Sequence, residues 1–478
     1  MQIFPVGFLF VAFFLLARLK SPQAGFIAAM SLVPLGAFAF LNFGDFSFIA
    51  YHAAFLIMIA LAVARHLISP KRHQFPRFEL AAIFLLILIF YALVTSQLMP
   101  RIFAGDVWVF SLQSGVVGQR VSPYFYSTVS LLQPSSGNIS QPIYLVLSAF
   151  VFLLASRMSR RYGTDFLDKS IFLAAAVNGT MGALDFVGAD AFLQIFKTAG
   201  YSFMVDVGVS GVTRIVGVFT EGSAMGGISA VLFAYMMMRY LDTGKRSALI
   251  LAALNFLWGV LALSSTGFVA LASAGTFIVW RSGRLNLSKR INPRIALRFL
   301  VVSALMIVGF AFILLFTNFG DTAWSFIDKL IFQKGTSLSA LERGSWAKRG
   351  IAVGFETYGL GAGFGSTLSN GLFSVLFSNL GVVGIVLYGA FLFSILRAPR
   401  KEFNSAIDLG LYNAAAASIV TFTVAQLISA TTADPGILFM VFAAIAVSSR
   451  PAKYMRWTLL DRTRRPIEQR IARGLIDP

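Results

Sequence analysis

The sequence contains no cysteine and only three histidines, His52, His66 and His73. Without cysteine the chain can form no disulfide, no zinc–thiolate centre and no thiol nucleophile, which removes several classes of enzyme. Charged residues are also scarce, at 12% of the chain, whereas 57% of its 478 residues are hydrophobic and the mean hydropathy is +0.78. This composition is too apolar for a soluble domain and indicates a polytopic membrane protein.

Repeated apolar segments with short connections predict an all-α membrane protein with about thirteen transmembrane helices, built as a single integral membrane domain over residues 1–478. The expected spans are residues 3–18, 24–42, 46–67, 77–98, 142–159, 168–188, 221–241, 247–263, 266–281, 296–316, 372–396, 408–429 and 434–449. The start of the chain, MQIFPVG, carries no basic residue, so we expect the first span to stay in the protein with its N-terminus outside.

Acidic residues are few, and the excess of lysine and arginine gives a formal net charge of +19. With the N-terminus outside, 30 of the 39 basic residues fall on the inside and 9 on the outside, as the positive-inside rule predicts. Membrane orientation therefore accounts for most of the charge, and nucleic acid is not an expected partner. The same topology predicts a basic cytoplasmic tail, residues 450–478, lying near anionic lipid.

The longest segment on the predicted outer side, residues 317–371, concentrates charge and glycine between two apolar spans. Its basic residues include Lys334, Arg343, Lys348 and Arg349, and they are followed by Gly359, Gly361, Gly363 and Gly365. Glycines at this density let a backbone turn tightly or approach a ligand closely. The alternative to a binding site is a solvated basic loop with a flexible exit.

Two helices are expected within this outer segment. Residues 324–331 have the spacing of a helix that lies along the membrane surface, and a second helix is expected over 339–357. At about 100° per residue, Arg343 points about 140° away from Lys348 and about 120° away from Arg349.

Arg343 is the expected inward-facing member of this basic group. Ala347, Gly350 and Gly354 follow it on the same helix face and would let that face pack closely. Lys348 and Arg349 are candidate substrate-binding residues, with solvent or lipid headgroups as the alternative surroundings.

A second charged pair stands where an outside segment enters the predicted span 221–241. Arg214 precedes Glu221 by seven residues, and both charges are costly at the edge of a membrane unless they are paired or used. A direct salt bridge between them, or a Glu221 side chain capping the helix N-terminus, is the structural alternative to a functional role.

Four short patterns follow one another on the predicted outer side. They are R-x-x-G-x-F-T-E at 214–221, S-x-x-x-R-x-x-W at 339–346, G-L-G-A-G-F-G-S at 359–366 and S-N-L-G-V-V-G at 378–384. In this order and setting the chain resembles the O-antigen polymerase and O-antigen ligase superfamily over about residues 210–390, while the earlier spans match only in hydropathy. The resemblance implies a glycosyltransferase of the C-type membrane architecture, with neither metal nor cofactor. Such an enzyme acts on undecaprenyl-pyrophosphate-linked oligosaccharide at the periplasmic face of the bacterial inner membrane.

Arg214, Glu221 and Arg343 are the expected catalytic residues under this resemblance. Arg214 and Arg343 match the motif arginines of the family, and a guanidinium can stabilise a leaving diphosphate by bidentate hydrogen bonding. Glu221 is the best-placed carboxylate to accept or orient the proton of the acceptor hydroxyl. Ligases carry a histidine ahead of G-x-x-G, and the corresponding place, counting back from Gly381, is Asn370 or Ser369. Asparagine cannot act as a general base, so the departure favours a polymerase and leaves Asn370 as a substrate-binding candidate.

Other functions stay open at the level of sequence. One is an O-antigen ligase that attaches glycan to lipid A core or to protein, with Glu221 in place of the histidine. Another is a lipid-linked oligosaccharide flippase, although no internal repeat of the kind common in transporters is found. A purely structural membrane protein would leave the outward-facing arginines unexplained. Membrane lipids and a regulator of chain length are further expected partners.

Overall fold

The chain forms a mostly helical assembly in its computed structural model, which describes residues 2–43, 46–68, 79–112, 119–120, 128–200, 214–284, 338–398, 403 and 405–450. The helices are α1 (Pro5–Lys20), α2 (Pro22–Ser31), α3 (Ala50–Ile68), α4 (Leu80–Ile102), α5 (Gly137–Tyr162), α6 (Asp165–Phe186), α7 (Asp190–Gln194), α8 (Gly222–Thr243), α9 (Arg246–Leu261), α10 (Ser265–Arg284), α13 (Leu338–Glu356), α14 (Leu372–Leu396), α15 (Ala406–Ser429) and α16 (Gly436–Ser448). The predicted helical fold class is therefore confirmed.

Two small antiparallel sheets accompany the helices. The strands are β1 (Gln2–Ile3), β2 (Ala39–Phe43), β3 (Phe46–Ile49), β4 (Trp108–Phe110), β5 (Gln119–Arg120) and β6 (Thr128–Leu131). Their orders are β1-β2-β3 and β4-β6-β5. Neither sheet was predicted from the sequence, because short strands between apolar segments carry little periodic signal.

Five of the described helices are long and apolar enough to cross a membrane: α4, α5, α8, α14 and α15. Three shorter apolar stretches, Ala50–Arg65, Arg246–Leu261 and Gly436–Ser448, coincide with predicted spans. Large apolar side chains are exposed along α1, α4 and α14, and patches of this kind mark surfaces that meet a membrane or a partner. The helices thus support a membrane protein, while the total of thirteen spans stays a prediction.

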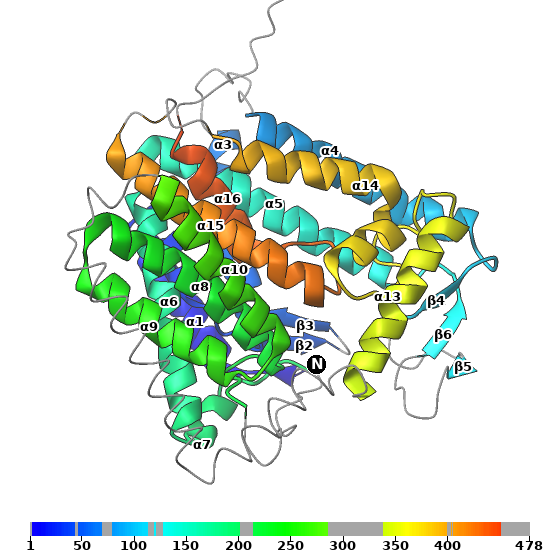
Figure 1. The fold of residues 1–478 in the computed structure, drawn as a ribbon, viewed down its shortest axis with the longest axis horizontal. Coiled ribbons are helices and arrows are strands. Elements are labelled where there is room, and N and C mark those ends of the chain that lie inside the picture. The colour runs from blue at the N-terminus through cyan, green and yellow to red at the C-terminus, as the bar shows by residue number, and fades with distance from the viewer. Residues whose placement is uncertain are drawn as a thin grey trace, which may run out of the picture.

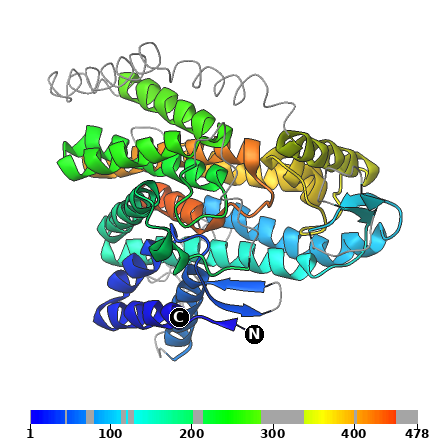
Figure 2. The same cartoon turned by 90° about the horizontal axis from the view of Figure 1, so that it is seen from below.

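The helix α8 is the most enclosed of these five. Of its most apolar stretch 83% is buried, against 33% for α4, and it packs against α9, α10 and α15. Figure 2 shows the helices stacked in layers, with most of them running along the long axis of the molecule. A helix that is apolar on all sides belongs in the interior of a bundle, and this one begins at the charged residues described below.

The predicted span 24–42 is wrong as a continuous helix. The helix α2 ends at Ser31, and the chain then turns into β2. Pro34 cannot donate a backbone hydrogen bond, and a Cβ at Gly36 would lie 2.8 Å from the Phe219 ring. The strand β2 pairs with β1, which directly precedes α1. Residues 32–43 therefore bring the chain back to the end of the bundle where α1 begins, as a second membrane span would have done.

The predicted span 46–67 also starts as a strand, β3, and becomes helical only at Ala50. Phe46, Ser47 and Phe48 of β3 alternate between aromatic and polar, which is the period of a strand, whereas β2 carries Asn42 as its one polar residue. The polar positions find partners on the segment after α7: Asn42 donates to the Thr198 carbonyl at 2.8 Å, and the Gly200 amide donates to Ser47 Oγ at 2.9 Å.

The helix α13 runs across one end of the bundle instead of along it (Figure 1). The C-terminal end of α4, the N-terminal ends of α5 and α14 and the sheet β4-β6-β5 gather at this end. The helix was predicted at 339–357 and is observed at 338–356. The predicted span 296–316, the surface helix near 324–331 and the tail after residue 450 lie outside the described residues.

Candidate active site

The first element of the site is an ion pair between two segments that are far apart in sequence. Glu221 lies in extended backbone directly before α8, and its side chain makes no capping hydrogen bond to that helix. Its Oε2 accepts from Arg343 Nη2 at 2.7 Å, and its Oε1 accepts from the Ser223 hydroxyl. The Arg343 and Glu221 side chains remain 32% and 34% exposed, so the pair stays accessible.

Arg214 completes a charged cluster with Glu221 and Arg343. Its Cδ lies 3.5 Å from the position that a Cβ on Gly222 would occupy, which places its stem over the start of α8. Burial lowers the pKa of the Arg214 guanidinium, the Glu221 carboxylate opposes this shift and the Arg343 charge adds to it. Its buried Nε has no hydrogen-bond partner among the described residues. Arg214 therefore lies within electrostatic reach of the Glu221–Arg343 pair, and the three side chains together have a net charge of +1.

The segment Arg214–Glu221 is a tightly held loop. The Asp185 carboxylate at the end of α6 accepts from the amides of Val216 and Gly217 at 2.6 and 2.8 Å. Gly217 has a φ of +60°, a conformation that favours glycine, which explains the glycine of the R-x-x-G-x-F-T-E pattern. Analysis of the sequence missed Asp185, and the available signal was an acid in the last turn of a helix, where the helix dipole disfavours it.

The helix α13 packs closely against α14 and the residues just before it, through the helix face that contains Ala347, Gly350 and Gly354. A Cβ at Gly350 would overlap Ser369 Oγ, and one at Gly354 would overlap the Phe377 ring. The Ser374 hydroxyl donates to the Ala347 carbonyl at 2.8 Å. The expectation that Ala347, Gly350 and Gly354 form a closely packed face is confirmed. This packing holds α13 where Arg343 can reach Glu221.

The three residues predicted to bind substrate, Lys348, Arg349 and Asn370, are not members of this ion pair. Lys348 is exposed, as its helical direction predicts. All three guanidinium nitrogens of Arg349 have partners: Nε donates to the Trp108 carbonyl at 2.6 Å, and Nη1 and Nη2 donate to the Glu356 carboxylate. The Asn370 amide donates to the Ile428 carbonyl at 2.9 Å. These contacts give Arg349 and Asn370 structural roles, and their binding of substrate stays a prediction.

The glycine run, which extends from Gly359 to Gly365, packs against a break in α14. Gly381 has a non-helical backbone, φ +64° and ψ −162°, which leaves the carbonyls before it without partners in the helix. The amides of Ala362 and Gly363 donate to the Ser378 and Asn379 carbonyls at 2.7 and 3.1 Å. The Tyr91 hydroxyl donates to the Leu380 carbonyl at 3.1 Å. Irregular backbone inside an apolar helix of this kind persists only when other protein groups satisfy its hydrogen bonds.

Asn379 links the glycine run to this break from the side of α14. Its Oδ1 accepts from the Gly365 amide at 3.1 Å, and its Nδ2 donates to the Thr367 carbonyl at 3.2 Å. A Cβ at Gly365 would overlap the Gly137 carbonyl at the start of α5, and Gly365 has a φ of +83°. The glycines thus allow a tight turn and a close approach of backbone to backbone. The tight turn is one of the two uses expected from the sequence, the other being a close approach to a ligand.

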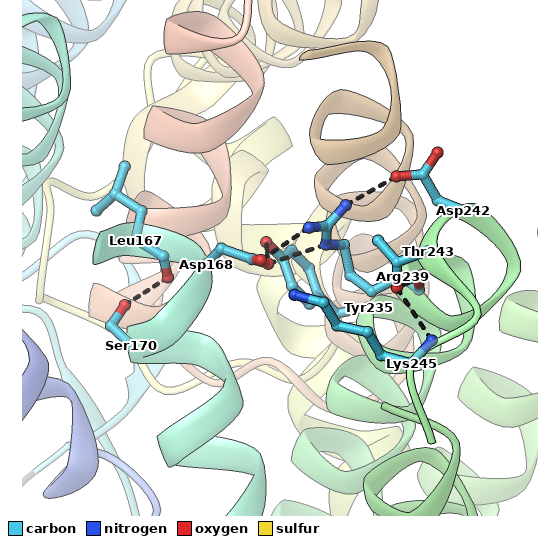
Figure 3. A network of polar contacts seen from close by, with 8 residues as sticks. All are labelled: Leu167, Asp168, Ser170, Tyr235, Arg239, Asp242, Thr243 and Lys245. Carbon is cyan, nitrogen blue, oxygen red and sulfur yellow. Dashed lines mark hydrogen bonds and ion pairs between the residues drawn. The ribbon is translucent and has the colours of Figure 1, made fainter. Parts of the chain in front are cut away.

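A second charged network lies at the opposite end of α8 (Figure 3). Arg239, with a side chain 7% exposed, donates to Asp168 of α6 at 3.0 and 2.8 Å and to Asp242 at 2.9 Å. The Tyr235 hydroxyl also donates to Asp168, at 2.9 Å. Arg239 and Asp168 are the less exposed part of this network, and their pairing ties α6 to α8, whereas the Glu221–Arg343 pair at the start of α8 is about one-third exposed.

Comparison with protein-family models and with curated proteins gives no match for this chain. In the part of the chain that the structure describes, no group of three or more histidine, aspartate or glutamate side chains is arranged to hold a metal ion. The function of the chain is therefore inferred from the geometry of the charged cluster and from the resemblance of the motifs around it.

Proposed function

We propose that this chain is a metal-independent membrane glycosyltransferase that polymerises lipid-linked oligosaccharide repeat units. The observation that carries the proposal is the convergence of Arg214, Glu221 and Arg343 at one end of the helix bundle, from segments separated by 122 residues. All three positions belong to the patterns that resemble the O-antigen polymerase and ligase superfamily. Two arginines with one carboxylate fit a site for an anionic leaving group and a proton acceptor.

The reaction requires charge stabilisation on the donor side. The acceptor oxygen forms a bond to the anomeric carbon of the growing chain, and the bond from that carbon to the diphosphate of the lipid carrier breaks. The diphosphate leaves with the bonding electron pair, so negative charge develops on its oxygens. Arg214 and Arg343 stabilise that charge, since a planar guanidinium can bind two phosphate oxygens at once.

On the acceptor side, Glu221 takes the proton of the attacking hydroxyl. In the structure, one carboxylate oxygen of Glu221 accepts from Arg343 and the other accepts from Ser223. A diphosphate oxygen competes with the carboxylate for the same guanidinium, so donor binding releases Glu221 to accept the proton. The ion pair is partly exposed, and pairs of this kind are worth only about 0–1 kcal/mol, so a doubly charged diphosphate displaces it readily.

The proposal includes a location and partners. The enzyme lies in the bacterial inner membrane with its N-terminus in the periplasm and its C-terminus in the cytoplasm, so the α13 end of the bundle faces the periplasm. Undecaprenyl-pyrophosphate-linked oligosaccharide reaches the site from the surrounding lipid, and a chain-length regulator acts on the product. A reporter fused after Pro478 should be active only in the cytoplasm, and periplasmic activity would reverse this orientation.

The decisive experiment is deletion of the gene with analysis of lipid-linked and surface glycan. A polymerase predicts that lipid-linked single repeats accumulate outside while long chains disappear. Long chains that remain attached to the lipid carrier would instead indicate a ligase. Single repeats retained on the cytoplasmic side would indicate a flippase. The purified wild-type protein in nanodiscs should extend lipid-linked repeats after chelation of divalent cations, and dependence on a metal would contradict the mechanism.

A further inference from the structure

The Arg214–Glu221 loop carries two of the three charged residues of the site, one at each end. Glu221 is fixed by its position next to α8. Arg214 depends on the loop itself, whose inner residues Val216 and Val218 are fully buried. Any backbone amide in such a loop must find a protein acceptor, because water does not reach it.

Three neighbouring elements supply those contacts. The Ile215 amide donates to the Leu261 carbonyl at 3.1 Å, and the Ala37 amide donates to the Val218 carbonyl at 3.0 Å. Between these two contacts, one oxygen of Asp185 accepts from both Val216 and Gly217. Of these three partners, Leu261 and Ala37 contribute backbone groups and Asp185 contributes a side chain, so Asp185 is the anchor that a substitution can remove.

The arrangement around Asp185 has the form of an anion nest. Two successive amides converge on a single carboxylate oxygen, and the left-handed conformation of Gly217 allows this. The acid stands in the last turn of α6, where the helix dipole is unfavourable for it. Its place is therefore explained by the loop it holds and not by the stability of its own helix.

We infer that Asp185 is a positioning residue for the active site: its carboxylate holds the Arg214–Glu221 loop so that the Arg214 side chain stays over the start of α8, beside Glu221. The contact does not involve substrate, so Asp185 acts through Arg214. The importance of the geometry for catalysis rests on the proposed function, whereas the contact between Asp185 and the loop can be tested independently.

The first measurement is hydrogen exchange of a peptide spanning Ile215–Val218, in nanodiscs and without any substrate. Asp185→Ala removes the acceptor and should speed exchange of the Val216 and Gly217 amides by about tenfold or more. Asp185→Asn keeps an acceptor oxygen and should restore most of the protection. Asp190→Ala, which removes an exposed acid from α7 a few residues later, is the matched control and should change nothing.

The second measurement is binding of inorganic pyrophosphate as a probe of the charged cluster. Asp185→Ala should weaken binding about as much as Arg214→Ala does, and the double variant should be no weaker than Arg214→Ala alone, because the two residues act as one unit. If Asp185→Ala does not fold, Gly217→Ala provides the same test, since a Cβ at a φ of +60° disturbs the same two amides.

The outcomes separate the two hypotheses. The positioning role would be overturned if amide exchange were unchanged in Asp185→Ala. It would also be overturned if Asp185→Asn lost as much amide protection as Asp185→Ala. If exchange responds as expected but Arg214→Ala binds pyrophosphate like the wild type, the positioning role survives, and the proposed function of the cluster fails.

Discussion

Arg343 on α13 and Glu221 at the start of α8 form an ion pair of 2.7 Å although 122 residues separate them. Arg343 reaches this position because α13 crosses the end of the bundle and is held there by Ser369, Ser374 and the bare backbone at Gly350. The guanidinium on α13 and the carboxylate directly before α8 are therefore preorganised on two separate segments. A ligand that binds between them meets charges whose positions are already fixed.

Replacing the arginines by lysine should impair polymerisation even though the charge is kept. A lysine ammonium is a point charge and cannot bind two phosphate oxygens in the fork geometry of a guanidinium. For Arg343→Lys and Arg214→Lys we expect a loss of about 10²–10³ in rate, the typical effect of removing one electrostatic contact to the transition state. The measurement is chain synthesis from lipid-linked repeats with protein inserted at equal levels.

Lys348→Ala is the control for these two variants, because Lys348 is exposed one turn further along the same helix. Its effect on chain synthesis should be much milder than that of either arginine-to-lysine variant, because its direction on the helix diverges from that of Arg343. Arg349→Ala is unsuitable as a control, since Arg349 binds the Trp108 carbonyl and Glu356. Normal chain length from both arginine-to-lysine variants would remove the diphosphate contact from the mechanism.

Glu221→Gln should abolish turnover while binding of the diphosphate persists. Glutamine keeps the shape of the side chain and can still accept from Arg343, but it cannot take up the proton of the acceptor hydroxyl. Loss of the competing carboxylate should also tighten binding of inorganic pyrophosphate by a few-fold, in line with about 0–1 kcal/mol for an exposed pair. Rate and affinity are measured on the same purified protein.

The helix α13 provides a matched control in its second arginine–glutamate pair. Glu356→Gln weakens the contact with Arg349, which lies away from the charged cluster, and should leave pyrophosphate binding unchanged. Unaltered polymer synthesis by Glu221→Gln at normal expression would leave Glu221 with the role of an ion-pair partner only.

Gly365→Ala should prevent correct folding of the loop before α14. The residue has a φ of +83°, and an added Cβ would overlap the Gly137 carbonyl, which is backbone and cannot move aside. We expect the free energy of unfolding to fall by about 3 kcal/mol or more, because backbone strain and overpacking both destabilise the folded state. Thermal unfolding in nanodiscs is the measurement. Gly389→Ala within α14, where a Cβ meets nothing within 4 Å, should be neutral or slightly stabilising, and equal effects would contradict this account of the glycine run.

Arg239→Met should destabilise the bundle from the end of α8 opposite the site (Figure 3). The substitution removes the counter-ion of Asp168, whose side chain is only 15% exposed, and one contact of the more exposed Asp242. Breaking a buried pair in this way typically costs about 3–5 kcal/mol. Arg246→Ala, at an exposed position beginning α9, should have little effect on thermal unfolding, and a melting temperature unchanged in Arg239→Met would show that the network contributes nothing.

The sequence predicted most of the helices, because long apolar runs bounded by charge, proline or glycine are a local signal. It also predicted that Arg343 faces inward, since the helical period and the small residues after it are local too. Short strands were missed where the spans 24–42 and 46–67 were expected, because the signals of Pro34 and of the Phe-Ser-Phe alternation in β3 were outweighed by overall hydropathy. The glycines were noticed, but the sequence could not distinguish a turn against α14 from a ligand-binding loop.

What the sequence determined by itself was composition, helix positions and the residue types available for chemistry. Only the tertiary structure decided which charges meet: Glu221 binds Arg343 and Ser223, Arg349 binds Glu356, and Asp185 holds the loop after Arg214. The physical reason is that hydropathy and periodicity act over a few turns of helix. Ion pairs between distant segments depend on how whole helices pack, and here the packing is set by glycine contacts and by the break at Gly381.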